Sequence, residues 1–290
     1  MNTTYLLGLF MGMIAALLLN VGKGVQKHNV RVFLEGRGMF RPPHRRSLLW
    51  WIVGLFMSGS ALFFFPLAVF LSNNPSAVSS MTGIGLIGLL LFAVYVIGEE
   101  VSAMDLIGVM LIVLGTSTLG YLGTLQTMVE PTFSDRTLFF TITGATAIFA
   151  ALCVMAYVRW PAIHGVSFGA TAGFMIGAGI FLADTAQLRG SESFLAKIQI
   201  PHLWVAFAFA ILALVVTQFG FLRSRALEVV PATNSAILLA PPLLEMVVYR
   251  TYPTATESLL TVVILAGVFL LSIGAAARIS EPTADAVNAG

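Results

Sequence analysis

Nine apolar stretches of membrane-spanning length fill this chain of 290 residues, arranged as four, one and four. A span needs about 20 mostly apolar residues. Because backbone in lipid must satisfy its hydrogen bonds internally, and the stretches are too long for barrel strands, we expect an all-α, polytopic transmembrane fold. The expected spans are 4–25, 48–71, 76–97, 103–123, 137–158, 163–186, 203–222, 231–249 and 257–277.

Composition supports a chain embedded in lipid. Charged residues make up 10% of the sequence, whereas soluble domains carry about 25%. The one cysteine, Cys153, lies inside a span, so neither a disulfide framework nor a Cys/His metal cluster is expected. The first apolar run has no preceding basic region and is long enough to span, so we expect a retained helix and not a signal peptide.

Lysine and arginine give the expected orientation, with the N-terminus outside and the C-terminus inside. Eleven of them fall on one side of the expected membrane and four on the other. We therefore expect a multi-pass protein of a bacterial inner membrane. The segment 26–46 is the only long basic connection. It either contacts anionic lipid head groups as an amphipathic surface element or acts only as a determinant of topology.

The last four stretches resemble the first four. Gly115 corresponds to Gly267 in the fourth helices. A single span between two four-span blocks makes the second block cross the membrane in the opposite orientation to the first. Such inverted repeats are typical of secondary transporters. We expect a first repeat at 1–123, a linker with the fifth helix at 124–160, a second repeat at 161–278 and a disordered tail at 279–290. The other matches pair Gly8, Gly12 and Gln26 with Gly169, Gly173 and Gln187, and Leu71, Pro75 and Ser79 with Leu227, Pro231 and Ser235.

Four short motifs follow one another in the first block: Asn20-Val-Gly-Lys23-Gly-Val-Gln-Lys27, Trp50-Trp51-Ile-Val-Gly54, Asn74-Pro75-Ser-Ala-Val-Ser-Ser and Gly98-Glu99-Glu100. This series resembles the drug/metabolite transporter superfamily, whose repeats carry a lysine late in the first helix and a Gly-Glu pair after a later one. A four-helix block of this order also looks like one small multidrug resistance subunit. Two such blocks joined by an extra helix resemble the nine-helix NIPA-like branch, usually described as magnesium transporters, and Thr217-Gln218-Phe-Gly-Phe-Leu222 in the second block is similar to the seventh-helix pattern there.

The chain departs from that resemblance at two places. Small multidrug resistance proteins couple protons through a glutamate midway along the first helix, where this chain has Ala15 and Ala16, with Gly177 as the repeat counterpart. The second helix of the NIPA-like branch should carry an acidic residue and an asparagine. Here that region reads Gly59-Ser60-Ala-Leu-Phe-Phe-Phe, which argues against magnesium.

Polar residues inside lipid are costly and mark candidate pathways. Asn20 and Lys23 share one face of the first helix with Lys27, so Lys23 could bind an anionic substrate, pair with Glu99 or Glu100, or extend to the interface. We expect Lys27 to extend to the interface. Glu99 and Glu100 are expected to be solvated caps or partners of the basic segment.

A second candidate face lies on the eighth helix, where Asn234, Pro241 and Glu245 share one side. Pro241 and Pro242 should interrupt that helix and free carbonyls for a substrate. Glu245 is a pathway carboxylate or an interfacial partner of Arg250.

Three further polar side chains are pathway candidates. Asp184 and Gln187 line a pathway or sit at a solvated helix end, and Asp184 occupies the repeat position of Lys23. Gln218 lines the cavity or bonds a neighbouring helix. Small residues predict close helix packing, and they are Gly165, Gly169, Gly173, Gly177, Ser76, Ser80 and Gly83.

These features favour a carrier that moves a small polar or charged solute by alternating access. The alternatives are a divalent-cation (magnesium) permease, and a lipid-carrier flippase subunit or non-transporting membrane protein. Without a nucleotide-binding loop, spaced metal ligands or an intramembrane catalytic pair, we expect no enzyme activity, catalytic residue, metal site or cofactor. The expected partners are membrane lipids, the solute or ion, and a second copy in a homodimer, with no nucleic acid.

Overall fold

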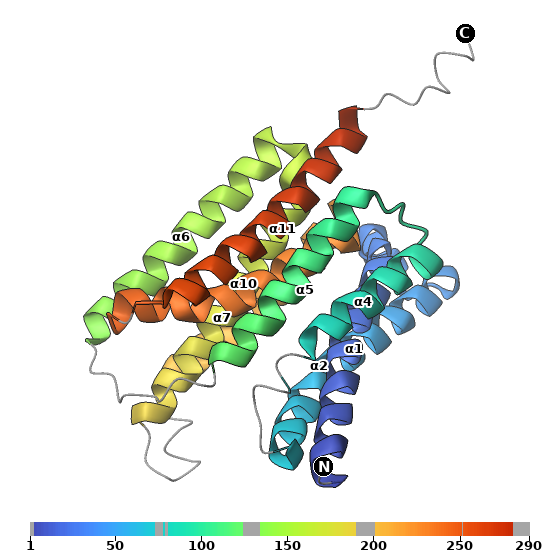
Figure 1. Cartoon of the computed structure of the whole chain (residues 1–290). Helices are drawn as coiled ribbons and strands as arrows, with labels where there is room; N and C mark the ends of the chain where they lie inside the picture. Colours follow the sequence, from blue (N-terminus) through green and yellow to red (C-terminus); the bar gives the residue numbers. More distant parts are fainter. Residues whose placement is uncertain are drawn as a thin grey trace.

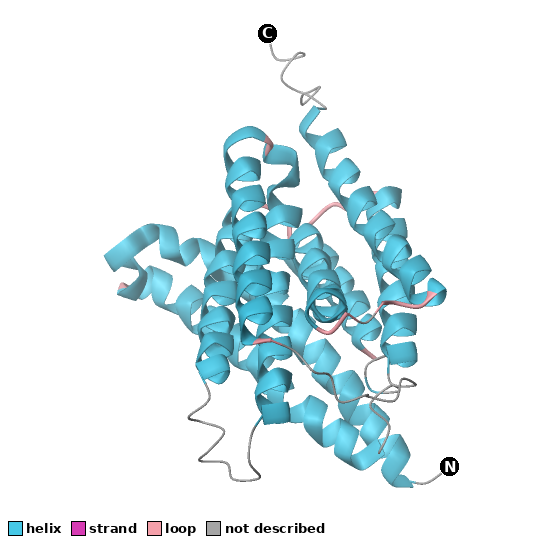
Figure 2. Cartoon of the chain, turned by 90° about the vertical axis from the view of Figure 1, so that its left-hand side faces the viewer, coloured by secondary structure: helices cyan, strands magenta, loops and turns pink. Residues whose placement is uncertain are grey.

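A computed structural model describes residues 3–72, 78, 81–123, 134–189, 201–250 and 252–280. Regular structure in these ranges is all helical and confirms the nine expected helices (Figure 2). Ser76, Ser80 and the tail from 281 onward lie outside the described residues. The helices are α1 (Thr3–Asn29), α2 (Pro42–Ser72), α4 (Thr82–Phe92) extended by η2 (Ala93–Ile97), α5 (Ala103–Gly123), α6 (Asp135–Arg159), α7 (His164–Arg189), α9 (Pro201–Arg223), α10 (Ala226–Val248) and α11 (Ala255–Ser280).

Seven of these helices are long and apolar enough to cross a membrane, and the described parts of α4 and α5 form shorter apolar helices. The outer surface fits lipid. On α2, Phe56, Phe63 and Phe70 are spaced by seven residues and are 74%, 79% and 82% exposed. A stripe of exposed phenylalanines on one helix face would be unstable in water and is stable against acyl chains. The fold is that of a multi-pass membrane protein.

Each half of the chain packs around its own first helix (Figure 1). In the first half α1 contacts α2 and α4, and in the second half α7 contacts α9 and α10. The connecting helix α6 packs beside α7, and α5 runs against α11 between the halves. Among the seven long apolar helices burial is concentrated in α7 and α10: 72% of the apolar window of α7 and 61% of that of α10 are buried, against 33% for α1 and 11% for α6.

Contacts at the helix ends fix the direction in which each helix runs. Arg223 at the end of α9 lies over the ring of Tyr157 at the end of α6, 4.4 Å from its centroid. Lys27 of α1 reaches the same end of α9. The start of α7 joins them, because His164 Nε2 lies 3.3 Å from the Tyr157 carbonyl. The first helix of one half therefore runs antiparallel to the first helix of the other. We call this end of the bundle the basic end.

The contact between α5 and α11 is reciprocal. A Cβ added to Gly267 would lie 2.7 Å from the carbonyl oxygen of Gly108 and 2.8 Å from Ile112 Cγ1, and one added to Gly108 would lie 2.8 Å from the carbonyl oxygen of Gly267. Likewise, a Cβ on Gly115 would lie 2.6 Å from Ile264 Cγ1. The offset that matches Gly115 to Gly267 also matches Ile112 to Ile264. Gly267 of α11 therefore packs on Ile112 of α5, and Gly115 of α5 packs on Ile264 of α11. Two matched pairs of residues that exchange contacts in this way are what a twofold interface contains.

The basic connection is more ordered than the sequence indicates. Instead of a loop from 26 to 46, α1 continues to Asn29, a 3₁₀ segment η1 (Val30–Phe40) follows, and α2 begins at Pro42, six residues before the expected start of its span. Proline is favoured in the first turn of a helix because its missing N–H is not needed there. Gly36 breaks η1 with φ of 52°, a left-handed value that glycine adopts without strain.

Candidate functional site

A chain of polar side chains connects α1 to α10 inside the bundle. Lys23 Nζ donates to Asn234 Oδ1 at 3.1 Å, and Asn234 Nδ2 donates to Asn20 Oδ1 at 2.6 Å. Asn20 Nδ2 completes the chain on the Ala16 carbonyl of its own helix at 3.0 Å. Asn20 is fully buried and Lys23 is 8% exposed. We call Asn20, Lys23 and Asn234 the central cluster. It joins three of the residues that the sequence singled out on two distant helices.

The Lys23 ammonium is incompletely satisfied within the described residues. An ammonium has three N–H donors and no acceptor, and the bond to Asn234 uses one of them. Among the described side chains no carboxylate lies within 4.0 Å of Lys23, and Glu99 pairs with Arg225 instead, so the structure does not show the pairing with Glu99 or Glu100 that was one of the three alternatives for Lys23. A charge held away from water is costly unless it is paired and hydrogen-bonded. The remaining donors therefore suit a polar or negatively charged ligand.

Small residues allow the helices to converge at the central cluster. Gly85 of α4 lies directly against the Ala16 carbonyl and Asn20 Nδ2, where a Cβ would not fit. Farther along α10, six and seven residues beyond Asn234, Gly177 of α7 lies against Ala240 and Pro241, because a Cβ there would come within 2.7 Å of Ala240 Cβ and 3.3 Å of Pro241 Cδ. α10 continues through Pro241 and Pro242 to Val248 as one helix, so the chain does not break there. The two prolines still have no N–H to donate, so the carbonyls of Ile237 and Leu238 lack their intrahelical donors, as expected.

A second polar network holds the basic end together. Gln218 Nε2 donates to Gln26 Oε1 at 2.8 Å, and Trp51 Nε1 donates to Gln218 Oε1 at 2.9 Å. Gln26 Nε2 donates to Ser58 Oγ at 2.9 Å and to the Gly54 carbonyl at 3.2 Å. Gln218 thus bonds neighbouring helices α1 and α2, the second of its two expected roles. Gln218 was among the polar candidates from sequence, whereas its partners Gln26 and Trp51, and Ser58 beyond them, were not.

Glu99 caps a helix of the other half. Its carboxylate accepts the backbone N–H groups of Ala226 at 2.7 Å and Leu227 at 3.3 Å, at the start of α10. Arg225 Nε lies 3.8 Å from Glu99 Oε2, and Arg225 Nη1 lies 3.3 Å from Asp105 Oδ2. A carboxylate at a helix N-terminus is stabilised by the free N–H groups and the helix dipole. Glu99 is therefore buried against α10, and its expected place as a solvated cap or a partner of the basic segment is wrong.

Asp105 was missed, although the sequence carries a signal for it. Ser102 N donates to Asp105 Oδ2 at 2.9 Å, and Asp105 N donates to Ser102 Oγ at 3.2 Å. Ser-x-x-acid just before an apolar run is the pattern of a capping box. Asp105 is fully buried, and its second role, the ion pair with Arg225, depends on a residue 120 positions away that local sequence does not indicate.

Lys27 also joins the two halves at the basic end. Its ammonium donates to the carbonyls of Phe221 and Ser224, at the last turn of α9. Helix ends leave their final carbonyls without partners, and a cation there is stabilised by the dipole. Lys27 thus serves as a cap for α9 instead of extending into the interface.

Of the other expected pathway residues, the structure places Glu245 away from the central cluster and leaves two side chains undescribed. Asp184 and Gln187 lie near the end of α7, and their side chains are outside the described part of the structure. Glu245 is half-buried and eleven residues from Asn234 on α10, about 16 Å along the axis at 1.5 Å per residue.

The glycine stripe of α7 faces α10. Gly165 lies against Glu228, Gly169 against Val229 and Ala232, Gly173 against Thr233 and Ala236, and Gly177 against Ala240. Gly83 of α4 lies against Val113 and Ser117 of α5, since a Cβ would come within 2.7 Å of each. Close backbone approach at small residues explains why α7 and α10 form the most buried pair.

No group of three or more His, Cys, Asp or Glu side chains in the described ranges could hold a metal ion. No family model matches the chain, and no curated protein or solved structure matches it either. The central cluster and the contacts at the basic end are therefore the basis for assigning a function.

Proposed function

We propose that the protein is a secondary transporter of a small polar or anionic solute, and that the solute binds at the central cluster. The observation that carries the proposal is the buried Lys23 ammonium, with one hydrogen bond to Asn234 and none to a carboxylate among the described residues. Charged groups within membrane helices by default mark a substrate or ion pathway. Lys23 belongs to α1 of the first half, and its ammonium bonds Asn234 on α10 of the second half. Movement of one half against the other would therefore change the surroundings of the ammonium.

The arrangement of helices supports inverted four-helix repeats. The antiparallel course of α1 and α7, the equivalent packing within each half and the reciprocal contact of α5 with α11 all fit a pseudo-twofold axis in the membrane plane. In such transporters the site lies at the repeat interface near mid-membrane. The gathering of lysine and arginine at the basic end supports a cytoplasmic position for that end, with the N-terminus outside. These features agree with the resemblance to the drug/metabolite transporter superfamily.

The charge at the site favours a polar or anionic solute over magnesium. A divalent cation would meet the Lys23 ammonium, and the Asn20 and Asn234 side chains near it offer two amide oxygens that already accept hydrogen bonds. Magnesium sites use carboxylates and near-ideal octahedral geometry. The basic end would serve as the inner gate, because Lys27, Glu99 and Arg225 all bond the opposite half there.

Alternating access can be tested without knowing the solute. In a Cys153→Ala background, Asn234→Cys should react with a membrane-impermeant maleimide in both right-side-out and inverted vesicles. His44→Cys, in the half-exposed segment at the basic end, should react from one side only, and the fully buried Leu89→Cys from neither. If Asn234→Cys reacts neither in right-side-out nor in inverted vesicles, while His44→Cys reacts in one of them, a transport pathway through the central cluster is contradicted.

A further inference from the structure

We propose that η1 and the start of α2 form a docking surface for anionic phospholipid. This surface consists of the 3₁₀ segment 30–40 and residues 41–50, and we call it the lipid-binding strap. From Gln26 to Arg46 the chain has six lysine and arginine residues and one acidic residue, Glu35. The described arginines at 31, 37, 41, 45 and 46 are all exposed. A cluster of this density next to a membrane helix attracts an anionic leaflet.

The strap also exposes apolar side chains beside its charges. Leu34 is 69% exposed, Phe40 65% and Trp50 50%. The opposite side of η1 is anchored, because Val32 is buried and the Phe33 ring meets the Trp51 ring edge-on, with centroids 4.8 Å apart. An element with one buried side, and with exposed aromatic and basic residues on the other, matches the composition of an interfacial anchor. The strap is therefore held in place on the bundle and turned toward a surface.

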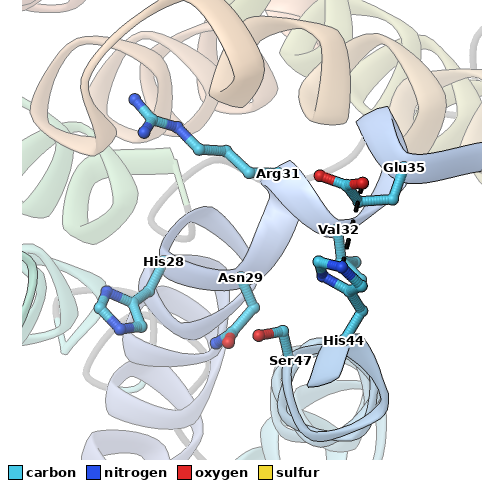
Figure 3. Close-up of a pocket in the computed structure, with 7 residues that line it drawn as sticks. All are labelled: His28, Asn29, Arg31, Val32, Glu35, His44 and Ser47. Carbon is cyan, nitrogen blue, oxygen red and sulfur yellow. Dashed lines mark ion pairs between the residues drawn. The ribbon is translucent and has the colours of Figure 1, made fainter. Parts of the chain in front are cut away.

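A small open pocket of about 150 Å³ lies between the strap and the end of α1 (Figure 3). His28, Asn29 and Ser47 line it together with the stem of Arg31, and Glu35 points toward His44, with 3.9 Å between Oε2 and Nε2. Asn29, Ser47 and His44 offer hydrogen-bonding groups in the lining, and Glu35 is its one carboxylate. The pocket is a place for a phosphodiester or glycerol head group, while the exposed apolar residues contact the acyl chains.

Tryptophan quenching gives a local measurement of lipid preference. Trp160 and Trp204 are more than half exposed, so Trp160→Phe and Trp204→Phe should be tolerated. The remaining Trp50 and Trp51 both belong to the strap or its anchor. The variant is reconstituted with brominated phosphatidylglycerol or brominated phosphatidylcholine, and relative binding constants are taken from quenching.

We expect a preference for phosphatidylglycerol that weakens with added salt. Arg41→Gln, Arg45→Gln and Arg46→Gln should each reduce the preference by up to about fivefold, because a basic residue near an anionic surface contributes about 1 kcal/mol. Glu35→Gln should increase it. Arg136→Gln, an exposed arginine at the opposite end of the bundle, should leave it unchanged.

Three results would overturn the proposal. The first is equal quenching by both lipids. The second is loss of the preference on adding inorganic phosphate at an ionic strength where sodium chloride leaves it in place, which would indicate a site for a soluble anion. The third is a Phe40→Ser variant that changes from dimer to monomer in light scattering without altered quenching. These measurements do not depend on transport, so the lipid proposal and the proposed function can fail separately.

Discussion

Replacing Gly267 by alanine tests the reciprocal contact of α5 with α11. The added Cβ would lie 2.7 Å from the Gly108 carbonyl oxygen, roughly 0.6–0.9 Å closer than an ordinary C···O contact. The neighbouring atom is backbone, so the helices must separate. Overpacking of this kind costs about 1–3 kcal/mol, and alanine returns about 0.5–1 kcal/mol through its helix propensity. We expect a net loss of stability.

The matched control is Gly144→Ala on α6, where an added Cβ meets nothing within 4 Å. That variant gains only the higher helix propensity of alanine. The difference in stability between the two variants is therefore the free-energy cost of overpacking at Gly267. The assay uses the buried thiol of Cys153, the only cysteine of the chain, which reacts with a thiol-sensitive dye when the protein unfolds on heating. At roughly 2–4 °C per kcal/mol, Gly267→Ala should melt roughly 2–12 °C below Gly144→Ala.

The double variant makes the test sharper. Gly108→Ala creates the same clash from the other side, with its Cβ 2.8 Å from the Gly267 carbonyl oxygen. One separation of α5 from α11 relieves both clashes, so Gly108→Ala with Gly267→Ala should cost less than the sum of the single changes, by about 0.5 kcal/mol or more. Strict additivity, or melting of Gly267→Ala at or above the temperature of Gly144→Ala, would refute the reciprocal contact.

Three further predictions concern the polar clusters. Lys23→Met should leave the melting temperature unchanged or raised, because replacing an incompletely satisfied buried charge by an apolar residue is often neutral or stabilising, and it should abolish solute transport in proteoliposomes. Glu99→Gln should destabilise the protein by about 1–3 kcal/mol in the same thermal assay, since the N-terminus of α10 loses its anion and Arg225 keeps only Asp105. Gln218→Leu should cost about 1–3 kcal/mol by leaving the Trp51 indole without its acceptor, and a shift of tryptophan emission would report it.

The helices could be predicted from sequence because lipid leaves the backbone few alternatives. An apolar run of about 20 residues must be helical to satisfy its N–H and C=O groups. The basic segment was harder to predict, because in η1 the ordering comes from Val32 and from Phe33 packing on Trp51, not from a local helical pattern. Tertiary contacts of this kind override local propensity.

The sequence indicates which residues form the candidate site, but it does not indicate which of them contact one another. Asn20, Lys23 and Asn234 stand out because each is polar within an apolar span, yet Lys23 and Asn234 are 211 residues apart in sequence. The assignment of Glu99 failed for the same reason, since the N–H groups that it accepts belong to Ala226 and Leu227 of the other half. The local sequence shows which polar groups need a hydrogen-bonding partner, but it does not show which residue of the other half that partner is.

The reciprocal contact between α5 and α11 has a consequence for assembly. Two separate subunits that met through this contact alone would have to bear the translational and rotational entropy of association. Here α5 and α11 belong to one chain, so their meeting is intramolecular and its effective concentration is set by the connecting segments. The interface can therefore remain weak and still form, which leaves α5 and α11 free to separate and shift by small amounts without dissociation of the two halves.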